Sequence, residues 1–231
     1  MNKQLESEKR IILTCISDTH KKHLQITQDL IQGDLIVHAG DVLRKPIGTL
    51  SQVFDFIDWF GQLPYKYKVF IGGNHDFSLV DNYDKIQEKV KQYPGMFYLC
   101  NDQIILTIKD HQIRIFGSPN SPSREHKRDA FSLDQAELLQ NRQQIPQNCD
   151  ILVTHCQPTG HDSCSLLEKF IRQNSTKIHI CGHEHFIYGY GKIKNTHVFR
   201  SSVVNFPQYE YENKPINLLW DFSKNQIELI K

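Results

Sequence analysis

The chain has 231 residues, enough for one large domain or two small ones, and we predict a single domain spanning residues 1–231. Hydrophobic residues make up 39% and charged residues 23%, which is typical of a folded globular protein and excludes a disordered chain. The 27 basic and 26 acidic side chains give a net charge of +1, so the overall charge favours neither nucleic acid nor an anionic membrane surface as a partner.

The N-terminal segment from Met1 to Arg10 is polar and leads directly into a strand-like run, without the apolar stretch of a secretion signal or a membrane span. The six cysteines form no Cys-x-x-Cys pair, and several lie in apolar runs where a reduced thiol behaves as a small hydrophobic group. We therefore expect a cytoplasmic protein without disulfides.

Short runs of β-branched residues predict buried strands, and runs with apolar residues at helical spacing predict helices between several of them. In chain order these are strands at Ile11 to Ile16 and Leu35 to Val37, a helix at Leu50 to Phe60, a strand at Lys68 to Ile71, helices at Asp81 to Gln92 and Asp134 to Arg142, a strand at Ile151 to Val153, a helix at Ser163 to Arg172 and a strand at Ile178 to Cys181. This alternation indicates an α/β layered fold.

A different pattern appears in two further parts of the chain. Ile104 to Lys109 and Ile113 to Phe116 are alternating runs joined by a short turn, which predicts a hairpin. Ser118 to Arg128 is rich in Ser, Pro and charge and predicts a surface loop. After residue 190, strand-like runs at roughly Thr196 to Val204, Ile216 to Phe222 and Gln226 to Ile230 suggest a second sheet.

Each of the five buried strand runs is followed by polar residues of the types that bind metals. They are Asp18 with His20, Asp41, Asn74 with His75, His155, and His183 with His185. In open α/β sheets, ligands bind beyond the carboxyl ends of the strands, so we expect these side chains to converge although they are far apart in sequence.

The mixture of residue types predicts the kind of metal and the chemistry. Neutral imidazoles with carboxylate and amide oxygens suit Mn, Fe or Zn, whereas a shell made only of oxygen atoms would favour Mg or Ca. We therefore predict two divalent transition-metal ions, with Asp41 as the candidate bridge and a bridging hydroxide as the nucleophile. Two ions also neutralise phosphate oxygens, so the predicted reaction is the hydrolysis of a phosphate ester.

Five sequence blocks carry a resemblance to a known family. They are Asp18-Thr19-His20, Gly40-Asp41, Gly73-Asn74-His75-Asp76, Thr154-His155 and Gly182-His183-Glu184-His185. In this order they resemble the five blocks of the calcineurin-like metallophosphoesterase superfamily. Two local sequences, Ile36-Val37-His38-Ala39-Gly40-Asp41 and Asp150-Ile151-Leu152-Val153-Thr154-His155, are similar to those of its MPPED branch.

The resemblance implies a four-layer αββα sandwich of two mixed sheets, and a metal-dependent phosphodiesterase activity that in related proteins includes cyclic nucleotides. It places Asp18, His20, Asp41 and His185 around one ion and Asp41, Asn74, His155 and His183 around the second. His75 would not be a ligand; it would act over the phosphate as a general acid or stabilise developing charge. His75, Asp41 and Asn74 are thus the predicted catalytic residues.

The chain departs from the family pattern at two places and keeps it at a third. Thr154 replaces the Gly that usually precedes the His of the fourth block, and Cys156-Gln157-Pro158 replaces a usual Gly-Pro-Pro. Animal members of the branch can carry Gly in place of His183, which weakens the second metal site. Since this chain retains the histidine, the resemblance implies a complete dinuclear centre.

Other polar residues have less specific predicted roles. His38, close to Asp41, is a candidate to hold a ligand by a hydrogen bond. Four arginines are candidates to contact a phosphate oxygen, and the sequence does not choose among them: Arg44, Arg124, Arg128 and Arg200. Surface or structural roles are predicted for the remaining histidines: His23, His111, His126, His161, His179 and His197.

We predict a phosphodiesterase that acts on a cyclic nucleotide or another small phosphodiester, with no membrane partner and no role for nucleic acid. A phosphomonoesterase or protein phosphatase is one alternative, but protein phosphatases resemble Gly-Asp-x-x-Asp-Arg-Gly where this chain has Gly40-Asp41-Val42-Leu43-Arg44-Lys45. A metal-binding, weakly active scaffold for protein interactions is the other. Protein partners, the native metals and the physiological substrate are left open.

Overall fold

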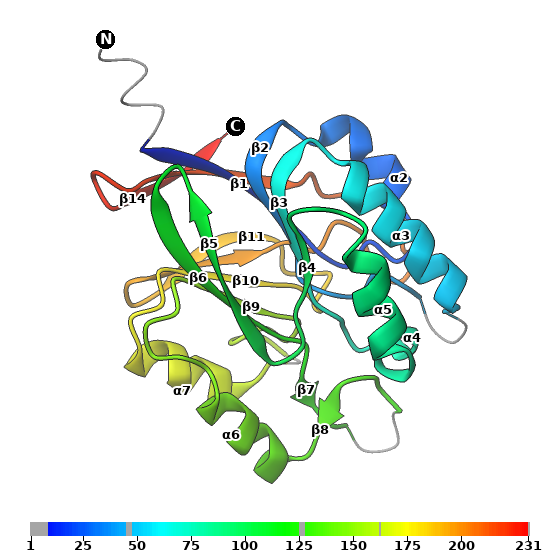
Figure 1. Cartoon of the computed structure of the whole chain (residues 1–231). Helices are drawn as coiled ribbons and strands as arrows, with labels where there is room; N and C mark the ends of the chain where they lie inside the picture. Colours follow the sequence, from blue (N-terminus) through cyan, green and yellow to red (C-terminus); the bar gives the residue numbers. More distant parts are fainter. Residues whose placement is uncertain (1–8, 45–47, 125–127, 162, 231) are drawn as a thin grey trace.

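The computed structural model describes residues 9–44, 48–124, 128–161 and 163–230. Two six-stranded sheets face each other across a shared apolar core (Figure 1). The first sheet, in spatial order, consists of β14 (Gln226–Ile230), β13 (Ile216–Asp221), β1 (Arg10–Ile16), β2 (Gly33–His38), β3 (Tyr65–Phe70) and β4 (Met96–Tyr98). The second consists of β11 (Gly189–Ile193), β12 (Thr196–Arg200), β10 (Ile178–Cys181), β9 (Ile151–Thr154), β6 (His111–Ser118) and β5 (Asp102–Ile108).

Both sheets are mixed. β1 to β4 run parallel and are followed at one edge by antiparallel β13 and β14. In the second sheet β12, β10, β9 and β6 run parallel, while β11 and β5 are antiparallel edge strands. Every residue of β9 and β10 is buried, because these strands are covered on both faces; this explains why apolar residues do not alternate with exposed polar ones there. Their two polar residues, Thr154 and His179, hydrogen-bond to each other.

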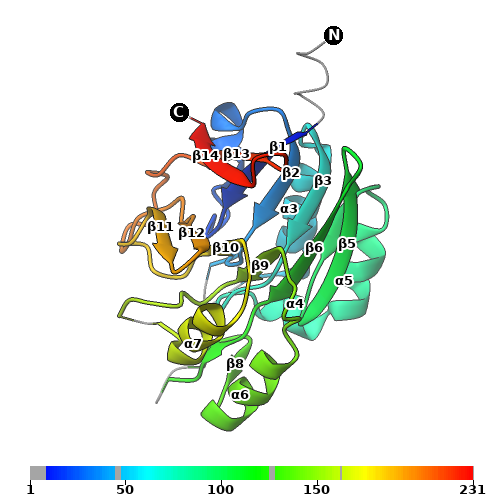
Figure 2. The same ribbon diagram turned by 90° about the vertical axis from the view of Figure 1, so that its left-hand side faces the viewer.

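Helices cover the outer face of each sheet, which gives four layers (Figures 1 and 2). The first sheet carries α2 (His23–Ile26), η1 (Thr27–Asp29), α3 (Leu50–Gln62), α4 (Phe77–Asp81) and α5 (Tyr83–Val90), and the second carries α6 (Gln135–Gln143) and α7 (Ser165–Gln173). Thr49 caps the N-terminus of α3: its hydroxyl accepts a hydrogen bond from the backbone N–H of Gln52, while the Gln52 side chain accepts one from the backbone N–H of Thr49. The predicted sandwich of two mixed sheets is confirmed.

The predicted assignment of the C-terminal strands to one second sheet is wrong. β12 does join the second sheet, but β13 and β14 extend the first, where β13 pairs antiparallel with β1 from Arg10↔Asp221 to Cys15↔Ile216. The alternation of a strand shows that one face is buried, but it does not show which sheet provides its hydrogen-bonding partner. β11 was not predicted, because glycines and exposed side chains interrupt its pattern.

The stretch from Ser118 to Arg128, predicted as a surface loop, is partly inside the molecule. Asn120 and Ser121 are buried, and β7 (Ser121–Pro122) pairs with β8 (Ser132–Leu133) in a small parallel ladder. Hydrogen bonds make this burial possible, since the Asn120 side-chain N–H donates to the backbone carbonyl of Phe131 and the backbone carbonyl of Asn120 accepts from Arg142. Polar composition alone does not reveal such partners.

No helix within the described ranges is long and apolar enough to cross a membrane. The N-terminal residues before Lys9 and the predicted surface residue His126 lie outside the part of the chain that the structure describes.

Candidate metal centre

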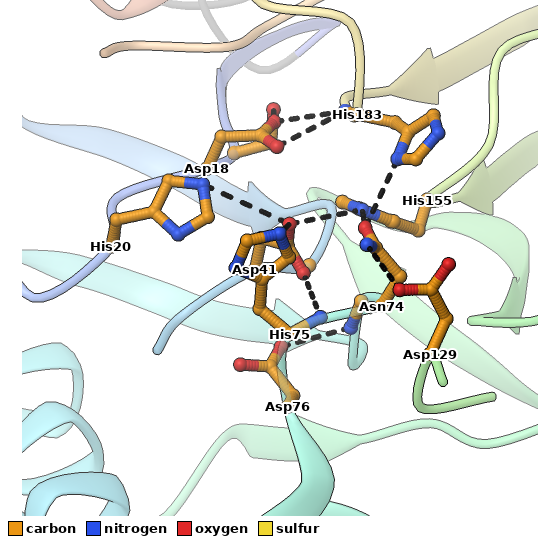
Figure 3. Close-up of polar contacts among 12 residues, drawn as sticks. Asp18, His20, Asp41, Asn74, His75, Asp76, Asp129, His155 and His183 are labelled. Atoms are coloured by element: carbon orange, nitrogen blue, oxygen red, sulfur yellow. Dashed lines mark hydrogen bonds and ion pairs between the residues drawn. The ribbon is translucent and has the colours of Figure 1, made fainter. Parts of the chain in front are cut away.

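The polar residues that follow β1, β2, β3, β9 and β10 meet at one place (Figure 3). The first three strands belong to one sheet and the last two to the other, so the site lies where the carboxyl ends of both sheets come together. The structure thus brings together every residue that the sequence proposed as a ligand, and also His75. Their role as metal ligands stays a prediction. The distances and hydrogen bonds among them decide whether they fit a metal ion.

The first group consists of Asp18, His20 and His185, whose possible ligand atoms all lie within 4.8 Å of one another. The Nδ1–H of His20 donates to the carbonyl of Leu43 (2.7 Å), and that of His185 donates to Val204 (2.8 Å). Both rings therefore point an Nε2 lone pair inward, and these two atoms are 3.4 Å apart. Facing lone pairs beside a buried carboxylate repel each other unless a cation lies among them, so this group fits a metal ion.

The second group consists of Asn74, His155 and His183. The Asn74 Oδ1 atom lies 3.0 Å from His155 Nε2 and 3.0 Å from His183 Nδ1. The other nitrogen of His155 donates to the carbonyl of Ala39 (2.9 Å), which again leaves Nε2 directed into the site. Two imidazole nitrogens and an amide oxygen that converge in this way suit a transition-metal ion.

Asp41 lies between the two groups. Its Oδ1 atom accepts a hydrogen bond from the backbone N–H of His75 (2.8 Å). Its Oδ2 atom faces the Nε2 atoms of His155 (3.4 Å) and His20 (3.7 Å), one from each group. This placement fits the predicted bridging role of Asp41.

The electrostatics of the site favour bound positive charge. Burial opposes a charge on His155, but the carboxylates of Asp41 and Asp18 outweigh it and raise the pKa of His155 to about 10. Burial lowers the pKa of His20 to about 4, so that ring is neutral at pH 7 and able to act as a ligand. Divalent ions would supply the positive charge that the buried carboxylates attract, without protonating the imidazoles.

The backbone is held in an unusual conformation at four of the candidate ligands. Their φ angles are positive: Asp18 (53°), His20 (42°), Asp41 (58°) and His183 (76°). Residues other than Gly rarely adopt this region, and such residues concentrate at functional sites. The backbone at position 182 lies so close to Asp18 that only Gly fits there, because a Cβ atom would collide with the Oδ2 atom of Asp18.

Asp76 joins the loops that follow β2 and β3. Its buried carboxylate accepts hydrogen bonds from the backbone N–H groups of Leu43 (2.8 Å), Val42 (3.2 Å) and Gly73 (2.8 Å). The loop that carries Asp41 is thereby fixed to the loop that carries Asn74. The sequence block that contains Asp76 was noted, but its structural role was not predicted.

Asp129 is a site residue that the sequence did not indicate. Its side chain is 2% exposed and accepts a hydrogen bond from Asn74 Nδ2 (3.3 Å), which turns the Asn74 oxygen toward the histidines (Figure 3). The other Asp129 oxygen accepts from Arg124 Nη2 (2.8 Å) and Nε (3.1 Å). Asp129 follows a stretch with no regular pattern, so its burial could not be read from the sequence.

Both departures from the family pattern form specific contacts next to the site. The Thr154 hydroxyl donates to the carbonyl of Cys156 (2.7 Å) and accepts from His179 Nε2 (2.8 Å), which anchors the backbone on both sides of His155. The Gln157 side chain accepts from Arg200 Nε (3.0 Å) and lies 3.4 Å from the carbonyl of Glu184. Arg200 also donates to Thr159, so it supports these loops, and it is not among the described residues that line the pocket.

The structure separates the remaining candidates. Among the four arginines, Arg124 lines the pocket beside the centre, whereas the Arg44 guanidinium stacks 4.2 Å from the Tyr209 ring and Arg128 lies 5.5 Å from the Phe77 ring. His38 was a candidate to hold a ligand by a hydrogen bond, and its ring hydrogen-bonds to other residues. Its ring contacts Thr19 Oγ1 (3.0 Å) and the backbone N–H of Gly40 (3.2 Å), which are the neighbours of ligands rather than the ligands themselves.

A pocket of about 810 Å³ opens over the two groups. This volume lies in the range of sites for organic ligands and exceeds what a phosphate group alone would need. The His75 side chain is 16% exposed and lines the pocket, and its Nε2 atom lies 3.9 Å from Asp41 Oδ2. His161, predicted to have only a surface or structural role, lines the pocket as well.

Comparisons with known proteins show the family of the chain. A family model described as calcineurin-like phosphoesterase matches residues 12–186. The human metallophosphoesterase domain-containing protein 1 is 31% identical over 230 residues, covering 87% of this chain and 68% of that protein. A probable rhamnogalacturonate lyase C of Emericella nidulans is 33% identical over 191 residues, covering 78% of this chain but 17% of that relative's length.

Among solved structures, the protein TT1561 of Thermus thermophilus has a TM-score of 0.68, covering 96% of this chain and 98% of that chain. Its sequence identity is 10%, so it shows the similarity of the fold alone. The family model and the human relative confirm the resemblance that the five sequence blocks carry. The chain therefore belongs to the calcineurin-like phosphoesterase family, in its MPPED-like branch.

Proposed function

We propose that this protein is a metal-dependent phosphodiesterase that uses two divalent ions of the Mn, Fe or Zn type. The observation that carries the proposal is the position of Asp41 Oδ2, which faces imidazole nitrogens of two separate ligand groups under one pocket. When bound, such ions lower the pKa of the attacking water and neutralise phosphate oxygens. The ligand set of imidazoles, carboxylates and one amide fits ions of this type.

The residues of the chain would divide the remaining tasks. Asp76 and Asp129 fix the orientations of the Asp41 loop and of the Asn74 side chain, so that the reacting groups meet a preorganised site. His75, whose ring reaches the pocket, would give a proton to the leaving oxygen or stabilise its charge. Arg124 lines the same pocket and would contact a phosphate oxygen.

The charge of the pocket wall supports a diester rather than a monoester. Apart from histidines and candidate ligands, the described lining residues carry one positive side chain, Arg124, and two negative ones, Asp129 and Glu184. A phosphodiester carries one negative charge, whereas a monoester carries about 1.5 to 2 at pH 7 and needs more cationic partners. The described wall adds no positive side chain beyond Arg124.

The test is an assay of the Mn-loaded protein on bis(4-nitrophenyl) phosphate and on cyclic nucleotides, with 4-nitrophenyl phosphate as the monoester. We expect the diesters to be hydrolysed with the higher kcat/KM. Faster hydrolysis of the monoester would identify a phosphomonoesterase. A protein that binds two ions and hydrolyses none of these compounds would contradict the enzymatic proposal and favour the scaffold alternative.

A further inference from the structure

Two exposed aromatic side chains stand beside the candidate metal centre, and we call them the aromatic wall. Phe186 follows His185 in the chain and is 78% exposed, and Phe206 is 45% exposed. Their ring centroids are 5.7 Å apart, and the ring planes cross at 80°. Single exposed apolar residues are common, but two large ones side by side at the rim of a pocket mark a place where a ligand or a partner binds.

The aromatic wall is continuous with the centre. The Phe206 ring lies 6.2 Å from the ring of His185 and 5.7 Å from that of Tyr209, which in turn lies 4.8 Å from His20. Tyr209 packs against these histidines and against the Arg44 guanidinium, is partly buried, and also lines the pocket. Phe186 and Phe206 are the more exposed aromatic side chains of the pocket and can meet a group bound at the centre.

The shape of the surroundings shows how accessible the wall is. Phe186 and Phe206 both line the 810 Å³ pocket over the ligand groups, and both also line a second hollow of about 390 Å³. The two rings thus stand between two open spaces. The larger space contains the candidate ligands, which favours a substituent of the phosphoester itself as the occupant of the wall.

We propose that the aromatic wall is a subsite for a planar aromatic group carried by the phosphoester. The inference rests on the proposed function and adds the class of substrate. Two rings at nearly a right angle form a corner in which a third ring can stack on one face and meet the other by its edge, the two arrangements that aromatic pairs prefer. A saturated group of the same size gains the burial of apolar area but neither of these contacts.

The test measures binding of simple phosphonates to the Mn-loaded protein by isothermal titration calorimetry. Phenylphosphonate, cyclohexylphosphonate and methylphosphonate share the metal-binding group and differ in the substituent. We expect the phenyl compound to bind at least about tenfold more tightly than the methyl compound and more tightly than the cyclohexyl compound. Equal affinities for all three, or no binding of any, would exclude an aryl ester as the source of the ring and leave only the nucleoside comparison to support the wall.

A second pair of ligands distinguishes an aryl ester from a nucleoside as the source of the ring. Adenosine 5′-monophosphate and ribose 5-phosphate differ by the base alone. Because the ribose separates the base from the phosphate, the base lies farther from the phosphorus atom than the ring of phenylphosphonate does. A base-dependent gain in affinity identifies a nucleoside subsite, and a gain confined to phenylphosphonate identifies an aryl ester. Either result supports the wall, and the lack of both gains contradicts it.

Variants at Phe186 separate a ring from apolar bulk. Because this side chain is exposed, F186L and F186Y should keep the melting temperature and the Mn stoichiometry of the parent protein. We expect F186L to reduce the phenyl-to-methyl affinity ratio at least about fivefold and F186Y to retain it. Y83L, which removes an exposed aromatic ring on α5, is the matched control and should leave the ratio unchanged.

The outcomes for the wall and for the proposed function can be told apart. If the Mn-loaded protein hydrolyses phosphodiesters but F186L keeps the phenyl preference, the wall is not the subsite and the proposed function stands. If no phosphoester is hydrolysed while the phenyl preference exists and is lost in F186L, the proposed function fails and the aromatic subsite stands.

Discussion

The Asn74 side chain presents one oxygen atom to two imidazoles, at 3.0 Å from His155 Nε2 and 3.0 Å from His183 Nδ1. Replacing Asn74 by Ala removes this oxygen, so we expect N74A to lose the second ion and at least roughly a hundredfold in phosphodiesterase rate. Metal analysis of the purified protein and initial rates on bis(4-nitrophenyl) phosphate measure the two effects. N195A, in the exposed turn after β11, is the control. A rate that survives N74A would show that the second group is wrongly assigned.

Asp129 acts on the centre through Asn74, as a positioning residue. D129A removes the acceptor that orients the Asn74 amide, so we expect the affinity for the second ion to fall about tenfold or more while the first ion is retained. Calorimetric titration with Mn resolves the two ions. The exposed Asp81 provides the matched variant D81A, which should bind both ions like the parent protein. Weakening of both ions to the same extent in D129A would point to a general structural defect instead.

At the scale of single residues, the sequence predicted the side chains that belong to strand ends and missed those whose role depends on a tertiary partner. Asp18 and His155 were predicted because each follows a recognisable apolar run. Asp129 and the hydrogen bond between Thr154 and His179 were not, because a carboxylate or an imidazole in sequence carries no sign of what it will contact when buried.

Among the secondary-structure elements, β9 and β10 are joined next to the centre by a buried histidine. His179 Nε2 donates to the Thr154 hydroxyl, and its Nδ1 atom has no hydrogen-bond partner. Burial lowers the pKa of His179 from 6.5 to about 3. The unfolded chain therefore takes up a proton on this residue between pH 6.5 and about 3, whereas the folded protein does not.

This difference predicts the pH dependence of stability. The contribution of His179 is present above pH 6.5 and is lost as the pH falls toward 3, at up to about 1.4 kcal/mol for each pH unit. The H179Q variant keeps a donor for Thr154 but cannot be protonated, so its free energy of unfolding should fall less steeply over this range. Urea titrations of the metal-free proteins at several pH values measure both slopes. Parallel slopes would mean that His179 is protonated in the folded protein.

Strands and helices with strong periodicity were predicted close to their observed positions, while their assignment to sheets was not. Leu50 to Phe60 is a helix that the structure extends to Gln62, and the predicted hairpin is β5 and β6. The sheet that receives β13 depends on β1 offering a free edge, which is a long-range property. The spacing of apolar residues shows which face of a strand or helix is buried. It does not show which other strand will be its hydrogen-bonding partner in the assembled core.

For the molecule as a whole, the candidate ligands join the two sheets. Asp18, His20, Asp41 and Asn74 follow strands of the first sheet, while His155, His183 and His185 follow strands of the second. An ion bound by both sets would oppose their separation on unfolding. Mn at about a hundred times its dissociation constant should therefore add about 2.7 kcal/mol per ion, raising the melting temperature by roughly 5–10 °C.

Differential scanning fluorimetry across a series of Mn concentrations measures this effect, and a chelator should reverse it. Ca serves as the control, because the imidazole-rich ligand set suits it poorly. A melting temperature that does not respond to Mn would contradict metal binding by the folded protein. The layered fold was implied by the five sequence blocks, but the meeting of two sheets at one centre became visible only in the structure.

Asp41, which lies between the two ligand groups, would link them thermodynamically. Asp41 Oδ2 faces one imidazole of each group, so if both groups hold an ion, occupation of one would change the affinity of the other and the two occupancies would carry a coupling free energy. Linkage requires this coupling to be reciprocal: the factor by which one ion changes the affinity for the other is the same in both directions. Through Asp41, a low concentration of the ion that binds at one group would thus lower the occupancy of the other group as well.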